Sequence, residues 1–330
     1  MDANELLKRY FKKDGSEAPP VSLLINELLE AWARVKDHEV NNELLEELVF
    51  KYAEAEKQLK QLNRDLLWQQ KRIQQDLDAA ADIQKSLLPH NTNMVDRANV
   101  AWFFEPCDKI GGDIFNLIQL DGDHWAIYML DVSGHGVPAA MVTVSVSQLM
   151  QYHTGFLMQR GPRSSTEVNI KSPVEVLNAL DREFPFDRFN NFFTINYLIL
   201  NTSTGKLSYA NAGHPKPVIL RKTGTLEELE SNGPPIGIRS LNLNDDQISF
   251  DEEQVQISPG DKVILYTDGL VEYYDENEEF YGNERFHNRL LELNGKSITD
   301  IINESIKSLK AFGKNKKPAD DITLLGFELT

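Results

Sequence analysis

The chain has little of three things: cysteine, long apolar runs and positive charge. Cys107 is the single cysteine among 330 residues, which excludes an internal disulfide framework and predicts a reducing compartment. No signal peptide is recognisable and no apolar run is long enough to span a bilayer, so we expect a soluble, cytoplasmic protein. Lysine and arginine number 34 against 51 aspartates and glutamates, a net charge of −17. This balance argues against binding nucleic acid through its phosphates.

Apolar content and length set the scale of the fold. Hydrophobic residues make up 41% of the chain, enough for one large globular domain and a smaller one. Residues 1–44 are helical in character, with short amphipathic runs broken by Asp14-Gly15 and Pro19-Pro20. We interpret them as a helical N-terminal regulatory region, and they match no sensor module that would name an input signal.

A stripe of apolar positions, separated alternately by three and four residues, begins at Leu45 and contains no proline or glycine. Its positions are Leu45, Leu48, Tyr52, Ala55, Leu59, Leu62, Leu66, Gln69, Ile73, Asp76, Ala80, Ile83 and Leu87. This rhythm predicts a coiled-coil helix over residues 45–88 and favours a parallel homodimer. Gln69 and Asp76 interrupt the seam, where polar groups weaken pairing but can set its register. The alternative is a long helix that packs on the N-terminal helices of its own chain.

Beyond Pro89 the pattern changes to short strands separated by clusters of helices. We expect strands at residues 100–104, 114–120, 125–132, 192–200, 206–211, 218–221, 255–257, 262–266 and 322–329. We expect helices at residues 137–158 and 173–184, a pair of helices within 283–312, and a loop over 160–172. Runs of adjacent strands favour antiparallel sheets covered by helices over a βαβ series, so the fold class of residues 89–330 is α+β.

Four short acidic motifs each place an aspartate where we expect an apolar strand to end. They are Gly111-Gly112-Asp113, Asp131-Val132-Ser133-Gly134-His135-Gly136, Thr267-Asp268-Gly269 and Ala319-Asp320-Asp321. Carboxylates gathered at the rim of a core repel one another and lose hydration, which is tolerable if they share cations. A set of oxygen ligands without cysteine suits Mg²⁺ or Mn²⁺ better than zinc. Taken singly, each motif can also be a turn or a solvated loop, since Asp-Gly is a common turn.

Read together, these segments resemble the PPM-type metal-dependent serine/threonine phosphatases, in their bacterial RsbU/SpoIIE-type branch. The resemblance covers about residues 79–330 and depends on seven motifs in order with the expected intervals. The motifs span residues 80–89, 110–115, 131–140, 211–215, 233–237, 266–272 and 319–325. It implies an α-β-β-α sandwich with two Mn²⁺ or Mg²⁺ ions at its rim. The cations would activate a water for direct attack on a phosphoserine or phosphothreonine, so no protein nucleophile is required.

Carried over position by position, the resemblance implies a set of metal-site residues. Asp131 would bridge the two ions, helped by the carbonyl of Val132. Asp113 and Asp268 would hold one ion, and Asp268 with Asp320 the other. We take Asp131 and Asp113 as the catalytic residues, acting through the metals. The complete metal set is Asp113, Asp131, Val132, Asp268, Asp320 and Asp321, the last at a place where relatives have Asn or Asp.

Two histidines near the motifs call for separate interpretations. In eukaryotic relatives a histidine that is a candidate general acid follows the metal-binding Asp-Gly pair, and here that place is Ser133. His135 lies two residues further on, which argues against a catalytic role for it without deciding the matter. We interpret His214 as a hydrogen-bonded residue at a strand end. No arginine near a motif stands out as a phosphate clamp.

The function implied by the resemblance is dephosphorylation of a phosphoserine on an anti-sigma-factor antagonist of the STAS class, within a partner-switching pathway. An unknown regulator would act on the N-terminal region, and residues 80–89 would join the coil to the catalytic core as a switch. Two other classes remain open. The chain could be a pseudophosphatase that only binds phosphoprotein, or a metal hydrolase of a small phosphate ester.

Overall fold

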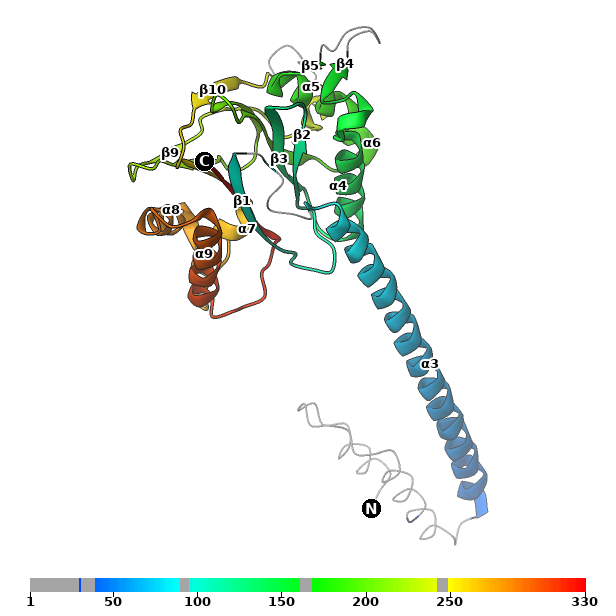
Figure 1. Cartoon of the computed structure of the whole chain (residues 1–330). Coiled ribbons are helices and arrows are strands. Elements are labelled where there is room, and N and C mark those ends of the chain that lie inside the picture. Colours follow the sequence, from blue (N-terminus) through cyan, green and yellow to red (C-terminus); the bar gives the residue numbers. More distant parts are fainter. Residues whose placement is uncertain (1–29, 31–38, 90–94, 96, 161–167, 242–248) are drawn as a thin grey trace. The chain divides into compact units, whose positions relative to one another are not determined.

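The computed structural model describes residues 30, 39–89, 95, 97–160, 168–241 and 249–330 (Figure 1). The chain forms two compact units, Met1–Gln74 and Gln75–Thr330. The helical region predicted for residues 1–44 lies largely outside the described residues. None of the described helices is long and apolar enough to cross a membrane.

Helix α3 runs from Glu39 to Ser86 and confirms the long helix predicted from the apolar stripe. Its sequence is rich in Leu, Glu, Gln, Lys and Ala, which favour helix, and two ion pairs with i,i+4 spacing support it. These pairs join Glu47 to Lys51 and Glu56 to Lys60, each at 2.5 Å. Residues 75–86 of α3 belong to the same unit as the sheets.

Two antiparallel sheets of five strands form the body of the second unit. The first contains, in spatial order, β1 (Ala98–Glu105), β12 (Ile322–Leu329), β11 (Lys262–Tyr266), β8 (Val218–Leu220) and β9 (Leu226–Glu228). The second contains β10 (Glu252–Gln256), β7 (Lys206–Ala212), β6 (Phe193–Asn201), β3 (His124–Val132) and β2 (Ile114–Gln119). Every pair is antiparallel, as the runs of adjacent strands predicted.

Helices cover the outer face of each sheet and complete four layers. Helices α8 (Gly282–Glu292) and α9 (Ile298–Phe312) share a buried cluster with the first sheet, and α4 (Val137–Leu149) and α5 (Pro173–Glu183) share one with the second. A third buried cluster lies between the sheets, because alternate residues such as Phe115 of β2 and Phe327 of β12 face the same interior. The α-β-β-α sandwich is therefore confirmed.

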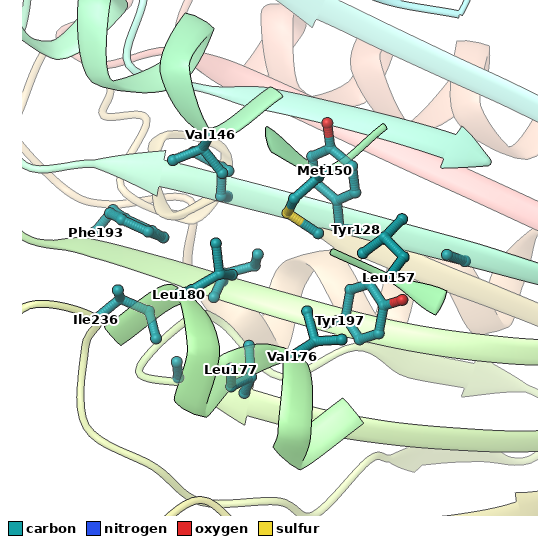
Figure 2. Packing of buried hydrophobic residues seen from close by; sticks show 14 of the residues in the cluster. Tyr128, Val146, Met150, Leu157, Val176, Leu177, Leu180, Phe193, Tyr197 and Ile236 are labelled. Carbon is teal, nitrogen blue, oxygen red and sulfur yellow. The ribbon is translucent and has the colours of Figure 1, made fainter. Parts of the chain in front are cut away.

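The cluster beneath α4 and α5 shows how the sequence pattern positions these helices (Figure 2). Val146 and Met150, four residues apart, point from the end of α4 toward Tyr128 and Phe193 on the second sheet. Helix α5 begins with a capping box, in which Ser172 accepts a bond from the Glu175 N–H and the Glu175 carboxylate accepts one from Ser172. Its buried residues are Pro173, Val176, Leu177, Leu180 and Asp181.

Two local predictions were wrong. The helix predicted for residues 137–158 ends at Leu149, and a 3-10 turn, Tyr152–Thr154, follows it before the left-handed Gly155. The loop predicted over residues 160–172 contains part of a short hairpin, β4 (Met158–Arg160) and β5 (Val168–Ile170). Strands β4 and β5 have three residues each, too few for either to show an alternating pattern. The remaining short elements are α6 (Phe186–Phe189), η2 (Ile238–Leu241) and α7 (Asp268–Val271).

Candidate metal centre

The four acidic motifs lie at strand termini. The prediction that a strand ends at each aspartate was wrong for Asp113 and Asp320, which precede their strands. Asp113 directly precedes β2 and Asp131 lies near the end of β3, its antiparallel neighbour in the second sheet. Asp268 follows β11 and Asp320 precedes β12, its neighbour in the first sheet. Antiparallel neighbours place the start of one strand beside the end of the other. Each sheet therefore contributes one pair of aspartates.

The electrostatics of Asp131 and Asp113 show that these pairs meet. Burial, followed by the negative charges of Asp268, Asp320 and Asp321, raises the pKa of Asp131 to about 8. Asp113 is 1% exposed, and burial followed by the charges of Asp131 and Asp321 raises its pKa well above the usual range. Carboxylates from both sheets thus act on one another at short range.

Asp268 and Asp320 form the more open side of this group. Burial, followed by the charges of Asp320 and Glu272, raises the pKa of Asp268 to about 6. Partial burial also raises the pKa of Asp320, while the imidazole of His135 acts in the opposite direction. Asp320 and His135 are exposed, so one side of the acidic group faces solvent.

Asp321 ties the motif loops together through backbone hydrogen bonds. Its Oδ1 accepts a bond from the Cys107 N–H at 2.7 Å. Its Oδ2 accepts bonds from the N–H groups of Gly112 at 2.7 Å and Asp113 at 3.3 Å. Both oxygens are therefore engaged in holding the loop before β2. The role of metal ligand that the resemblance implies for Asp321 stays a prediction, and its contacts favour a positioning role.

Three glycines leave room for this close approach. A Cβ atom on Gly111 would lie 2.2 Å from Asp321 Oδ2, and one on Gly269 would lie 2.1 Å from the Asp321 carbonyl oxygen. A Cβ atom on Gly112 would lie 2.7 Å from the carbonyl oxygen of Val132 and 3.4 Å from Asp131 Oδ1. Side chains at these positions would force the segments apart, which explains why glycine flanks the aspartates.

The donor set fits divalent cations that prefer oxygen. It consists of carboxylates with the Val132 carbonyl nearby, and the mutual repulsion described above favours neutralisation by cations. The Thr323 hydroxyl donates to Asp113 Oδ2 at 2.5 Å and so orients that carboxylate. Cys107, Asp320 and Asp321 also place possible ligand atoms within 4.8 Å of one another. Burial raises the pKa of the Cys107 thiol to about 12, which disfavours a thiolate ligand.

Gln84 of α3 holds the same loop from another side, and sequence reasoning did not single it out. Its side chain is 4% exposed, and its Nε2 donates to the Gly111 carbonyl at 2.7 Å. Its Oε1 accepts from the Gly111 N–H at 3.0 Å. Ala81 packs with Ile110 and Ala140 beside this contact. The available signal was the spacing of Gln84 three residues after Ala81, which places both side chains on the same face of the helix.

His214 has the surroundings expected of a structural residue. It is buried, and its Nδ1 lies 2.7 Å from the Thr194 hydroxyl. Burial lowers its pKa to about 3, so the imidazole is neutral near pH 7. The loop that carries His135 is anchored instead through Ser133, whose N–H donates to the Phe192 carbonyl at 2.9 Å.

Comparisons of sequence agree with the motifs. The family described as Stage II sporulation protein E (SpoIIE) matches residues 121–330. Protein IcfG of Synechocystis sp. is 28% identical over 266 residues, covering 76% of this chain and 41% of that protein. Phosphoserine phosphatase RsbP of Bacillus subtilis is 28% identical over 203 residues, covering 60% of this chain and 45% of that protein. The chain thus spans roughly half the length of the curated relatives it matches.

Solved structures share the fold. The SiaA-PP2C domain of Pseudomonas aeruginosa superposes with a TM-score of 0.65 at 21% identity, covering 79% of this chain and 98% of that one. The RsbU and RsbW domains of a Mycobacterium tuberculosis protein give a TM-score of 0.56 at 23% identity, covering 70% and 59%. The chain therefore belongs to the SpoIIE family and has the fold of the PP2C-type phosphatases that its acidic motifs resemble.

Proposed function

We propose that this protein is a metal-dependent protein serine/threonine phosphatase. The observation that carries the proposal is the group of carboxylates from Asp113, Asp131, Asp268 and Asp320, which separate segments bring to one rim. Burial raises the pKa of each group, and neighbouring charges add to the cost of ionisation. Two curated relatives carry the name phosphoserine phosphatase, which supports the same activity.

Two Mn²⁺ or Mg²⁺ ions are the proposed cofactors. Asp131 would bridge them with help from the Val132 carbonyl, Asp113 and Asp268 would hold one ion, and Asp268 with Asp320 the other. When bound, the cations would supply Lewis-acid chemistry, which lowers the pKa of water toward neutrality and offsets negative charge on a phosphoryl group. A solved relative of similar fold, RsbX, is described in complex with magnesium.

The chain's own residues would hold the carboxylates and admit the substrate. Thr323 fixes the orientation of Asp113, and Asp321 anchors the loop before β2 through three backbone N–H groups. Asp320 and His135 mark the exposed side of the group. A phosphoserine on the surface of a folded protein could reach the site from that side, because Asp320 and His135 are exposed there.

The proposed substrate is the phosphoserine of a STAS-class anti-sigma-factor antagonist in a partner-switching pathway. Support comes from the two Bacillus subtilis relatives, RsbP and RsbU, both named phosphoserine phosphatases. Such a pathway ends on a sigma factor and would run in the cytoplasm. A pseudophosphatase is disfavoured because all four carboxylates are present and gathered together. Hydrolysis of a small phosphate ester is the other candidate activity.

A comparison of two substrates tests this proposal. We expect the purified chain with Mn²⁺ to dephosphorylate a phosphorylated STAS protein with a kcat/KM at least about 100-fold above that for an aryl phosphate. The reason is that contacts with parts of the substrate protein away from the phosphate also stabilise the transition state. A higher kcat/KM for the aryl phosphate would favour a small-ester hydrolase. Phosphoprotein binding without turnover in any divalent metal would favour a pseudophosphatase.

The proposed assembly is a homodimer through α3, with an unknown regulator at the N-terminal region. Large apolar side chains along one stripe of the helix are exposed in the single chain: Leu48, Tyr52, Leu59, Leu62, Leu66 and Ile73. Burying them against the same stripe of a second copy would remove this apolar surface from water. The contact of Gln84 with Gly111 would then join the end of the coil to the candidate metal centre.

A further inference from the structure

A second face of α3, distinct from the apolar stripe, carries a concentration of positive charge. Residues 57–72 contain five lysines and arginines and one aspartate, whereas the whole chain carries a net charge of −17. Lys57, Lys60, Arg64 and Lys71 follow one another at intervals of three, four and seven residues. These intervals place them on one side of a helix. We call this side, with Leu67 and Trp68 beside it, the basic face.

Two of the four cations of the basic face lack the helical ion pairing that the third, Lys60, has with Glu56. Glu47 pairs with Lys51 and Glu56 with Lys60, the i,i+4 arrangement usual on a solvated helix. Arg64 and Lys71, by contrast, have no acidic residue three or four positions away in either direction. The ion pairs seen among the described residues include neither of them. Their charge is therefore available to a partner.

Two large apolar side chains project beside these charges. Leu67 is 59% exposed and Trp68 is 62% exposed. The Arg72 guanidinium carbon lies 5.7 Å from the centroid of the Trp68 ring, so this arginine stacks near the indole. The basic face thus combines a tryptophan, an arginine and a leucine. Tryptophan and arginine are enriched at the hot spots of protein interfaces.

A dimer of α3 would leave this face uncovered. With Leu59 and Leu66 at heptad position a, Leu67 and Trp68 fall at b and c, and Arg64 at f. Positions b, c and f point away from the seam of a two-stranded coil. The apolar stripe and the basic face therefore require different partners.

We propose that the basic face docks an acidic protein partner, through a segment that places carboxylates opposite the cations and an apolar side chain against Leu67 and Trp68. Charge complementarity selects an acidic partner and the two apolar residues supply its anchor. A lipid surface fits less well, because two apolar side chains fall short of the continuous apolar face of an interfacial helix. Nucleic acid fits less well because the rest of the chain is strongly negative.

Binding of a defined acidic peptide tests the proposal on the full chain. The probe is a synthetic amphipathic helix about four heptads long, with a leucine seam flanked by glutamates, and its counterpart with lysines in place of glutamates. We expect fluorescence anisotropy to show binding of the glutamate peptide at low salt and not of the lysine peptide. Arg64→Glu should weaken binding by about tenfold, and Trp68→Ala by a similar factor.

Lys51→Glu is the matched control, since it makes the same charge reversal on α3 outside the basic face. It should leave peptide binding within about twofold of the parent, and circular dichroism should show unchanged helix content in every variant. Equal weakening by Arg64→Glu and Lys51→Glu would show that the peptide responds to the net charge of the helix and not to the basic face, and would overturn the proposal. Absence of peptide binding would overturn it as well, as would tighter binding to vesicles of anionic phosphatidylserine.

Discussion

Helix α3 and the rim of the sandwich depart from the usual distribution of side chains in opposite ways. The helix exposes leucines such as Leu59 and Leu62, while the rim withdraws carboxylates such as Asp113 and Asp131 from water. Apolar surface left in water and charge removed from it are both costly unless something else is bound. The comparison teaches that the two regions favour different partners, and the proposals above assign another protein to the helix and cations to the rim.

The largest effect should follow from removing one carboxylate from the rim. We expect Asp131→Asn to fold normally but to retain under about 1% of phosphatase activity with Mn²⁺, a loss near 3 kcal/mol in the barrier. Added Mn²⁺ should raise the melting temperature of the parent and not of this variant, because only a bound ion stabilises the folded state. Substantial turnover by Asp131→Asn in saturating Mn²⁺ would refute the assignment.

Removing the carboxylate of either Asp113 or Asp320 should have a comparably large effect. Asp113→Ala and Asp320→Ala should each abolish turnover, and their combination should lose little more, because residues that act as a unit are not additive. Steady-state rates on phosphoprotein for the two single variants and the double variant measure this. Independent, multiplying losses would show that the two carboxylates serve separate purposes.

The exposed stripe of α3 is tested by placing charge in it. Leu62→Glu/Leu66→Glu should convert a dimer into a monomer, since unpaired carboxylates in a buried seam cost several kcal/mol. Light scattering at micromolar concentration measures the mass. Gln61→Glu/Gln75→Glu adds the same charge at outer positions of the helix and should remain dimeric. If the parent chain is already a monomer, the stripe packs within its own chain or on another protein.

Gln84 joins the two regions and should have an intermediate effect. Gln84→Leu removes both hydrogen bonds to Gly111 and leaves buried backbone groups unpaired, at about 1–3 kcal/mol. We expect turnover to fall by about tenfold with little change in helix content. Gln75→Leu, at an exposed position of the same helix, is the control and should match the parent. Unchanged turnover in Gln84→Leu would separate the helix from the candidate site.

The smallest effect should be that of His135. Its imidazole lies near Asp320 on an exposed loop, so we expect His135→Ala to keep activity within about tenfold of the parent. Rates measured across a range of pH provide the check. A far larger loss in a folded variant, together with loss of one limb of the pH profile, would promote His135 to general acid.

Local pattern was enough to predict the long helix, the antiparallel strands and the positions of Asp131 and Asp268 at strand ends. These features depend on periodicity and on short motifs, which a single sequence displays directly. The β4–β5 hairpin and the end of α4 were missed because they depend on three-residue strands and a 3-10 turn. The contact between the buried Cys107 and Asp321 was missed as well, because it joins residues 214 positions apart.

The sequence by itself determined which acidic motifs the chain contains and which helix carries an apolar stripe, because short motifs and spacing along the chain display both. Only the tertiary structure decided which residues of those motifs face solvent and which hold neighbouring loops by hydrogen bonds. Asp320 and Asp321 are adjacent in sequence, yet Asp320 is exposed while both oxygens of Asp321 accept backbone N–H groups of a loop more than 200 residues away. Gln84 likewise acquires its role only where α3 meets Gly111. Such contacts join distant segments, and their geometry is set by how the two sheets pack.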